Sequence, residues 1–120
     1  MSLFTQEAFD TFAGALAGVT FVDQWGSRVA KVGGKVFTLL NDWRGSKQII
    51  FKCPEETFEI LTSIDGIEQA PYFAKRQWVS VSSEADLPEE DLKLYIQRSY
   101  KRVAKGLTKK VRAELGIQLD

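Results

Sequence analysis

The chemistry that this sequence can offer is concentrated in a run of basic side chains near its C-terminus. Seven lysines and arginines occupy positions 98–112 with no acid among them, namely Arg98, Lys101, Arg102, Lys105, Lys109, Lys110 and Arg112. Clusters of this kind bind the phosphates of nucleic acids. The alternative is a solvated helix face whose bases complement the helix dipole, because acids gather at the opposite end, in residues 84–91.

Groups suited to catalysis are scarce. The chain has no histidine, which removes the commonest general base and the commonest zinc ligand. Its single cysteine, Cys53, precedes Pro54 at an expected helix start, where a helix dipole can lower a thiol pKa. The alternative for Cys53 is inert packing. The acids Glu89, Glu90 and Asp91 are consecutive and fan around a helix, so they make a poor metal cage. We therefore expect no enzyme, no cofactor and no metal site.

Length and composition favour one globular domain spanning residues 1–120. The 44 % hydrophobic and 27 % charged content is ordinary for such a domain, and 16 bases balance 16 acids. Any attraction for nucleic acid must therefore be local. A single cysteine allows no intrachain disulfide, the N-terminus lacks a secretory pattern, and no apolar run approaches the roughly 20 residues that cross a bilayer. We expect a cytoplasmic protein with no membrane partner.

The element that must position the basic run is a helix over residues 86–112. Apolar and small residues recur there at helical spacing, at Leu92, Tyr95, Ile96, Ser99, Val103 and Leu107. Asp86 with Glu89 resembles a capping box at its start. Gly106 is expected to end or bend this helix. Thr108 is then a cap for a second short helix over residues 109–115, closed by Gly116.

A β-hairpin is the clearest local signal in the first half of the chain. Two β-rich runs, residues 28–32 and 35–40, flank Gly33-Gly34, and a two-residue glycine connection is typical of a hairpin turn. The expected register places Val32 opposite Lys35, Lys31 opposite Val36, and Ala30 opposite Phe37. One face then carries Ala30, Val32, Phe37 and Leu39 toward the core, and the other carries Lys31, Val36 and Thr38.

The remaining pattern predicts an α+β fold. Residues 5–16 and a segment beginning at 54 read as helices, residues 20–25, 47–52 and 78–82 as strands, and residues 41–46 and 68–77 as a loop and an irregular segment. We expect an antiparallel sheet of about five strands, with N- and C-terminal helices packed on one face. Alternation in the strands over 47–52 and 78–82 directs Ile49, Phe51, Val79 and Val81 toward the core. The other face would expose Lys31, Thr38, Lys52, Trp78 and Ser80. Alternatively, residues 68–77 fold over that face and bury Trp78.

Taken in order, these segments resemble the MmcQ/YjbR family. The resemblance rests on Trp25-Gly26, Lys31 to Phe37, Phe51-Lys52, Ala70-Pro71-Tyr72, Trp78-Val79, Arg98-Ser99-Tyr100 and Leu107 to Lys110. It implies a CyaY-like (frataxin-like) fold and a "double wing" DNA-binding role. Frataxin-like proteins also carry a dense acidic ridge on the first helix and nearby strand. Here that region offers only Glu7, Asp10 and Asp23, so iron binding is not expected.

Two hypotheses about function follow. The first is a non-enzymatic DNA-binding module whose contacts are Lys31, Lys35, Arg44, Lys52, Lys75, Arg76, Arg98, Lys101, Arg102, Lys105, Lys109 and Lys110. Trp43 and Trp78 are its candidate stacking residues, because aromatic rings stack on nucleic-acid bases. The second is a protein-interaction or regulatory module that binds a protein partner through the sheet face around Trp78. A steep loss of affinity with salt would distinguish the first from the second.

Overall fold

The computed structural model describes residues 2–24, 26–43 and 45–119, apart from the side chain of Trp43. Trp25 and Arg44, which the sequence singled out, lie outside the described residues. The elements of the described part are α1 (Gln6–Gly14), β1 (Val19–Gln24), β2 (Ser27–Val32), β3 (Lys35–Trp43), β4 (Ser46–Lys52), α2 (Glu55–Thr62), β5 (Ile67–Gln69), β6 (Trp78–Ser82), α3 (Glu89–Lys105) and α4 (Lys109–Leu115).

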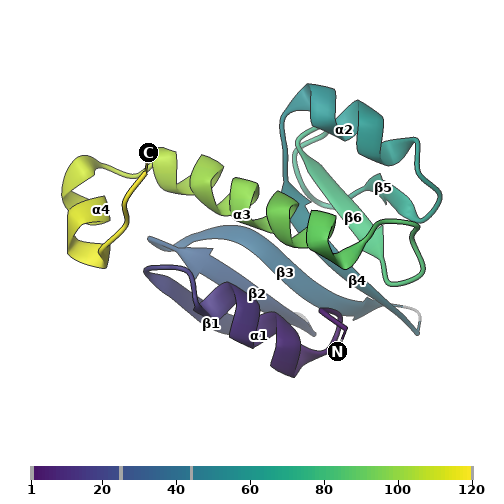
Figure 1. Ribbon diagram of the computed structural model, residues 1–120, viewed down its shortest axis with the longest axis horizontal. Helices are drawn as coiled ribbons and strands as arrows, with labels where there is room; N and C mark the ends of the chain where they lie inside the picture. The colour runs from purple at the N-terminus through teal and green to yellow at the C-terminus, as the bar shows by residue number, and fades with distance from the viewer. Residues whose placement is uncertain (1, 25, 44, 120) are drawn as a thin grey trace.

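The strands form one antiparallel sheet in the order β1-β2-β3-β4-β6-β5 (Figure 1). The expected α+β class is confirmed. The sheet holds one strand more than expected among the described residues, because β5 lies within the stretch predicted to be irregular. Three residues are too few to show the alternation by which a strand is recognised. The predicted loop over residues 41–46 is also mostly strand, since Trp43 pairs with Ser46 across the β3–β4 turn.

Three helices cover one face of the sheet. α1 packs on β1 and β2, α3 crosses β2, β3 and β4, and α2 packs on β5 and β6 (Figure 1). Their apolar stripes meet the sheet in one continuous core, to which α1 gives Phe9 and α3 gives Leu92 and Ile96. From the strands, Ile49, Phe51, Val79 and Val81 enter the same core, as the alternation predicted. Burial of this apolar surface is the main stabilising term of the fold.

The hairpin at Gly33-Gly34 forms, but its register departs from the expected continuous one after the second pair. Val32 pairs with Lys35 and Lys31 with Val36, and then a bulge makes Ala30 pair with Thr38. The extra residue reverses the faces of the rest of β3. Thr38 therefore points into the helix-covered core and is wholly buried, while Leu39 lies on the opposite face with Val29 and Ile50. The predicted faces of Thr38 and Leu39 were wrong for this reason.

The long helix begins at Glu89, without the capping box predicted from Asp86 and Glu89. Pro88 occupies the N-cap position and no side chain caps the first turn. Instead, Glu89 Oε1 accepts a hydrogen bond from the backbone N–H of Leu3 at 2.6 Å. The carboxylate thus fastens the N-terminal segment, where Leu3 is buried, to the start of α3.

The short final helix forms as predicted. Thr108 Oγ1 accepts from the N–H of Val111 at 3.2 Å, and Gly116 ends α4 in a left-handed conformation with φ of 73°. After α4 the chain turns back toward the end of α3 and buries Ile117 (Figure 1). Among the described residues, no helix combines the length and apolarity that a membrane span requires.

Candidate functional site

Five of the predicted basic residues line one groove beside α3, and four of them come from α3 itself. Arg98, Lys101, Arg102 and Lys105 stand at i, i+3, i+4 and i+7, which places them on one side of a helix. The opposite side holds the buried stripe that packs on the sheet, so these four side chains are directed to solvent and are exposed. The groove has a volume of about 370 Å³ and is also lined by Lys52, Cys53, Pro54, Thr57, Tyr95 and Leu119. We call it the basic groove.

The basic groove contains five basic residues and no acidic one among its described lining. Within residues 2–24, 26–43 and 45–119, the side-chain ion pairs involve Arg28, Arg76 and Lys93, and none involves a base of the groove. The positive charges of the basic groove are therefore not compensated by a described carboxylate. The guanidinium carbon of Arg98 lies 5.6 Å from the ring centroid of Tyr95, so this arginine is braced against an aromatic ring.

Lys52 lines the basic groove, and Lys35 lies outside its lining. The Lys52 ammonium lies 6.0 Å from the ring centroid of Trp78, its cross-strand partner. Lys35 Nζ reaches the C-terminal end of α3, 3.8 Å from the position that a Cβ on Gly106 would take. The β2–β3 turn therefore lies next to the C-terminal end of α3, so both elements can contribute to one binding surface.

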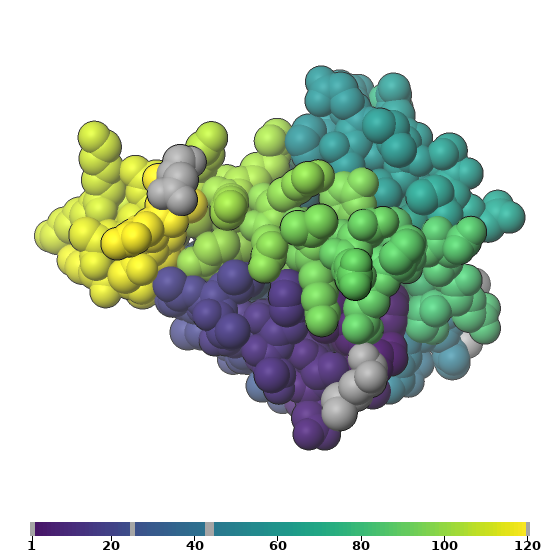
Figure 2. Space-filling view, viewed as in Figure 1, coloured from purple at the N-terminus to yellow at the C-terminus, as the bar shows by residue number. Residues whose placement is uncertain are grey.

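The other predicted contacts fall into separate places. Lys109 and Lys110 lie on the first turn of α4 and are exposed. Figure 2 shows the α4 segment, in yellow, as a projection at the end of the molecule beyond α3. Lys31 lies on β2 and pairs with Val36, whose side chain packs on the sheet face opposite to the helices. These residues can extend a phosphate-binding surface, but they do not line the basic groove.

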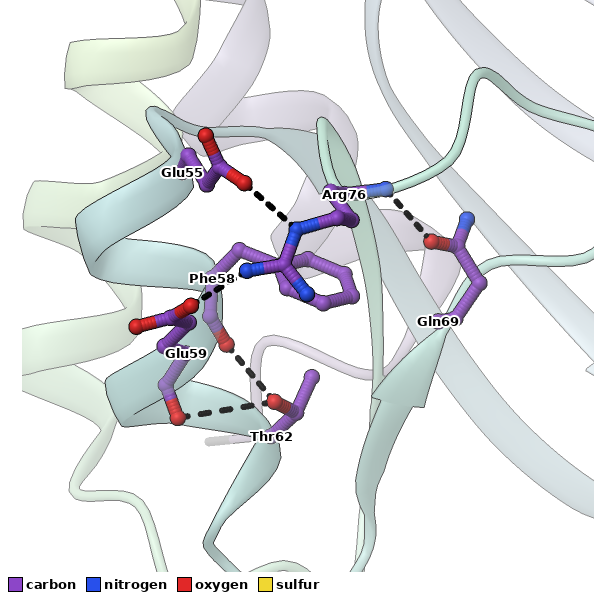
Figure 3. A network of polar contacts seen from close by, with 6 residues as sticks. All are labelled: Glu55, Phe58, Glu59, Thr62, Gln69 and Arg76. Atoms are coloured by element: carbon purple, nitrogen blue, oxygen red, sulfur yellow. Dashed lines mark hydrogen bonds and ion pairs between the residues drawn. The ribbon is translucent and has the colours of Figure 1, made fainter.

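Arg76 is paired with acidic residues of α2 and does not line the basic groove. It forms ion pairs with Glu55 at 2.6 Å and with Glu59, both on α2, and its guanidinium carbon lies 5.6 Å from the ring centroid of Phe58 (Figure 3). The hydrogen bonds to Glu55 and then Glu59 raise the pKa of Arg76. Because its charge is already matched, Arg76 fits the predicted DNA surface poorly. Lys75, beside it, is exposed on the same loop.

Trp78 is not available as an exposed stacking ring. It is 9 % exposed, and its ring centroid lies 4.6 Å from that of Phe73, which comes from the loop that folds over this sheet face. The backbone of that loop is joined to β6 by a hydrogen bond from Ala70 N–H to the Trp78 carbonyl, at 3.1 Å. The alternative in which residues 68–77 cover Trp78 therefore describes the structure, and Thr38 and Ser80 are buried as well. Trp43 was the other predicted stacking residue, and its side chain lies outside the described residues.

Cys53 borders the basic groove but is 3 % exposed. Burial raises the pKa of its thiol to about 11, and the opposing effect of the nearby Arg102 charge is smaller. The helix-dipole effect considered from sequence is thus outweighed by desolvation. Packing, the alternative considered for Cys53, matches this environment.

Two of the three acids of the first helix and strand, Asp10 and Asp23, are paired with Arg28. Arg28 Nη2 lies 3.0 Å from Asp10 Oδ2 and Arg28 Nη1 lies 3.3 Å from Asp23 Oδ1. The hydrogen bond to Asp10 is the largest cause of a raised pKa at Arg28. In the part of the chain that the structure describes, no three His, Cys, Asp or Glu residues gather into a metal-ligand cluster.

A second groove, to which no sequence pattern pointed, lies on the sheet face that residues 70–73 partly cover. Its volume is about 530 Å³. Val29, Leu39 and Ile50 lie at its base, and Tyr72 and Phe73 border it. Asn41, which had been assigned to a polar loop, lies in β3 at one end of this groove. We call it the sheet-face groove.

An open antiparallel sheet with helices on one face and a basic groove along the last long helix defines the structural class. The chain belongs to the YjbR family, whose model matches residues 14–102. The match spans both strands of the glycine hairpin and ends within α3, so it includes Arg98, Lys101 and Arg102. No curated protein matches the chain.

Solved structures show the same fold. The crystal structure of Deinococcus radiodurans protein DR2400, which carries the domain DUF419, is 24 % identical and covers 95 % of this chain and 89 % of that chain, with a TM-score of 0.84. A protein from Pseudomonas syringae is 19 % identical and covers 79 % of this chain and 95 % of that chain, with a TM-score of 0.69. At these identities the likeness concerns the fold alone.

Proposed function

We propose that this YjbR-family chain is a non-enzymatic DNA-binding protein of the cytoplasm that holds phosphates in the basic groove. The observation that carries the proposal is the groove itself, in which Arg98, Lys101, Arg102 and Lys105 converge with no described carboxylate to neutralise them. Such charges gain free energy from phosphates chiefly by releasing the counterions condensed on DNA. The family relationship is compatible with this role but does not supply it.

The spacing of the four bases suits a nucleic-acid strand. Residues 98–105 span about 10 Å of helix, from the rise of about 1.5 Å per residue. Since one strand of duplex DNA carries a charge every 3.4 Å along the axis, about three phosphates fit along this stretch. The contact would be extended by Lys35, a β3 residue whose ammonium lies near the C-terminal end of α3, and by the exposed Lys109 and Lys110. Little base specificity is expected, because phosphate contacts carry no sequence information.

The experiment is a fluorescence-anisotropy titration of labelled duplex and single-stranded DNA at about 50 and about 200 mM salt. If the four α3 bases of the groove contact the three or so phosphates that fit along this stretch, the log–log salt slope on duplex DNA should be about −2.7. A Lys101→Glu, Arg102→Glu double variant should bind at least tenfold more weakly at the lower salt. Both substituted positions are exposed, so the fold should persist.

The matched control changes net charge by the same amount away from the groove. Lys47→Glu with Lys75→Glu alters two exposed lysines that do not line the groove, although the sequence had suggested Lys75 as a DNA contact. If the groove is the binding site, DNA affinity should stay within about twofold, apart from the long-range effect of charge. Equal loss in the two double variants would show that only global charge matters. Absence of binding to both DNAs at the lower salt would overturn the proposal.

The protein-interaction alternative is weaker after the structure is considered. It relied on an exposed Trp78, and that ring is covered by Phe73 and the loop around it. A partner would have to displace this loop, which Arg76 fastens to α2 (Figure 3). The basic groove needs no such rearrangement, so we favour DNA binding.

A further inference from the structure

Tyr95 is the one aromatic residue in the described lining of the basic groove. Its ring lies nearly parallel to the ring of Phe51, with 7° between the two planes and 5.8 Å between the centroids. Phe51 is wholly buried, so this contact covers Tyr95 from the core side. The guanidinium of the exposed Arg98 lies over the same ring. Tyr95 is therefore held between a ring of the core and a cation of the groove.

The ring next to Lys52 is covered in a similar way. Lys52 also lines the groove, and its ammonium lies 6.0 Å from the ring centroid of Trp78. Trp78 is itself buried against Phe73. Two of the five bases of the groove thus stand against aromatic rings. A nucleic-acid base that stacked on Tyr95 or Trp78 would first have to displace the side chains that cover them.

This arrangement removes one of the two means by which proteins bind single strands. Proteins that bind single-stranded DNA without sequence preference combine a basic groove with aromatic rings on which successive bases stack. With its ring covered, the basic groove keeps only the attraction of its charges for phosphates. That attraction is stronger for duplex DNA, because the two strands together carry one charge per roughly 1.7 Å of axis and more counterions are released for each phosphate contacted.

We propose that Arg98 is a specificity-determining residue of the basic groove, which covers Tyr95 and so restricts the groove to the phosphate backbone of duplex DNA. The inference rests on the DNA-binding role proposed above and names the form of DNA that the groove takes. Lys101 stands about one turn further along the same side of α3 and makes no cation–ring contact within the described residues. Loss of Lys101 removes a charge alone, whereas loss of Arg98 removes a charge and uncovers a ring.

The test compares a labelled single strand, free of self-complementary segments, with the duplex that it forms with its complement, by fluorescence anisotropy at about 50 mM salt. We expect the unmodified protein to bind the duplex at least about fivefold more tightly. Arg98→Ala should weaken duplex binding but spare the single strand, because stacking on Tyr95 replaces the lost charge, so the preference should fall to about one. Lys101→Ala is the matched control, which should weaken both complexes and keep the preference within about twofold.

A second substitution identifies the ring as the cause. Tyr95→Leu added to Arg98→Ala should restore the preference for duplex, because the stacking surface is gone. If this double variant does not fold, the ring protons of Tyr95 provide the same test by NMR. They should shift when the single strand is added to the Arg98→Ala variant, and should not shift in the unmodified protein.

The outcomes separate this inference from the proposed function. Equal affinity of the unmodified protein for the two DNAs, or an unchanged preference in the Arg98→Ala variant, would overturn the inference and leave DNA binding in place. Failure of the unmodified protein to bind either DNA would overturn the proposed function itself, and this inference with it.

Discussion

The hydroxyl of Ser99 donates a hydrogen bond to the carbonyl of Phe37 at 2.6 Å, across 62 residues of chain. Phe37 is the residue that the bulge inserts into β3, next to the change of register with β2. The same hydroxyl oxygen accepts from the backbone N–H of Lys52, at 2.9 Å, just beyond the last paired residues of β3 and β4. One buried side chain of α3 therefore serves polar backbone groups of two strands.

We expect Ser99→Ala to destabilise the protein by about 1–3 kcal/mol, because two buried backbone groups lose their partner. Urea denaturation with far-UV circular dichroism measures the change. The control is Ser83→Ala, an exposed serine whose side chain forms no hydrogen bond in the described part of the protein. Equal stability of the two variants would mean that Ser99 has no special role in joining α3 to the sheet.

Gly33→Ala should destabilise more than Gly34→Ala. Both glycines have positive φ, 58° and 80°, so both substitutions carry the same kind of backbone cost. A Cβ at Gly33 would also fall 2.7 Å from both Cδ atoms of Leu107, whereas a Cβ at Gly34 meets nothing within 4 Å. The difference between the two variants in thermal unfolding measures the contact of the hairpin with the α3–α4 connection.

A double-mutant cycle identifies the cause of that difference. Leu107→Ala removes the atoms that a Cβ at Gly33 would strike, so the cost of Gly33→Ala should fall when both changes are combined. Additive effects of Gly33→Ala and Leu107→Ala would show that backbone conformation, and not this contact, limits position 33.

Arg76→Ala should loosen the loop that covers Trp78 without weakening DNA binding. The arginine pairs with Glu55 and Glu59 on α2 (Figure 3), and none of these three residues lines the basic groove. We expect faster chymotryptic cleavage next to Tyr72 and Phe73, together with DNA affinity within twofold of the unmodified protein. Lys75→Ala is the control, because this neighbouring lysine forms no ion pair within the described residues. A large loss of DNA affinity in the Arg76→Ala variant would instead indicate that Arg76 contacts DNA.

Cys53 should react slowly with Ellman's reagent in the folded protein. With a pKa of about 11, raised by burial, only about 0.1 % of the thiol is ionised at pH 8, and the thiolate is the reactive species. Unfolding in urea should accelerate the reaction by at least about a hundredfold, since both ionisation and access increase. Because the folded pKa is raised, the thiol contributes stability at neutral pH that declines as pH rises from about 9 to about 11.

Some residues of the basic groove could be predicted from the sequence, but their ion-pairing partners could not. Helical spacing was enough to place Arg98, Lys101 and Arg102 on one side of a helix, and the structure keeps them there. Arg76 could not be separated from them by sequence, because its partners lie 17 and 21 residues away and meet it only after folding. Charge alone does not reveal whether a base already has a carboxylate.

In the sheet, too, some features could be predicted from the sequence and others could not. Gly33-Gly34 predicted the hairpin. The alternation of apolar and polar residues in β4 predicted that Ile49 and Phe51 lie in the core. The bulge left no local signal, since Phe37 to Leu40 is a continuous β-rich run in which either parity is acceptable. The hydroxyl of Ser99 supports the bulge from a distant helix. The sheet-face groove escaped prediction for the same reason, because it depends on the face that Leu39 adopts.

The strand order has a consequence for how the chain reaches its native state. From β1 to β4 each strand pairs with the next one along the chain, so this meander can form from short turns with little loop-closure entropy. We expect α3 to dock later, because its contact with Phe37 closes a separation of 62 residues. We therefore expect a transition state with the meander formed and α3 not yet docked. In stopped-flow experiments, Ser99→Ala should then raise the unfolding rate and leave the folding rate nearly unchanged.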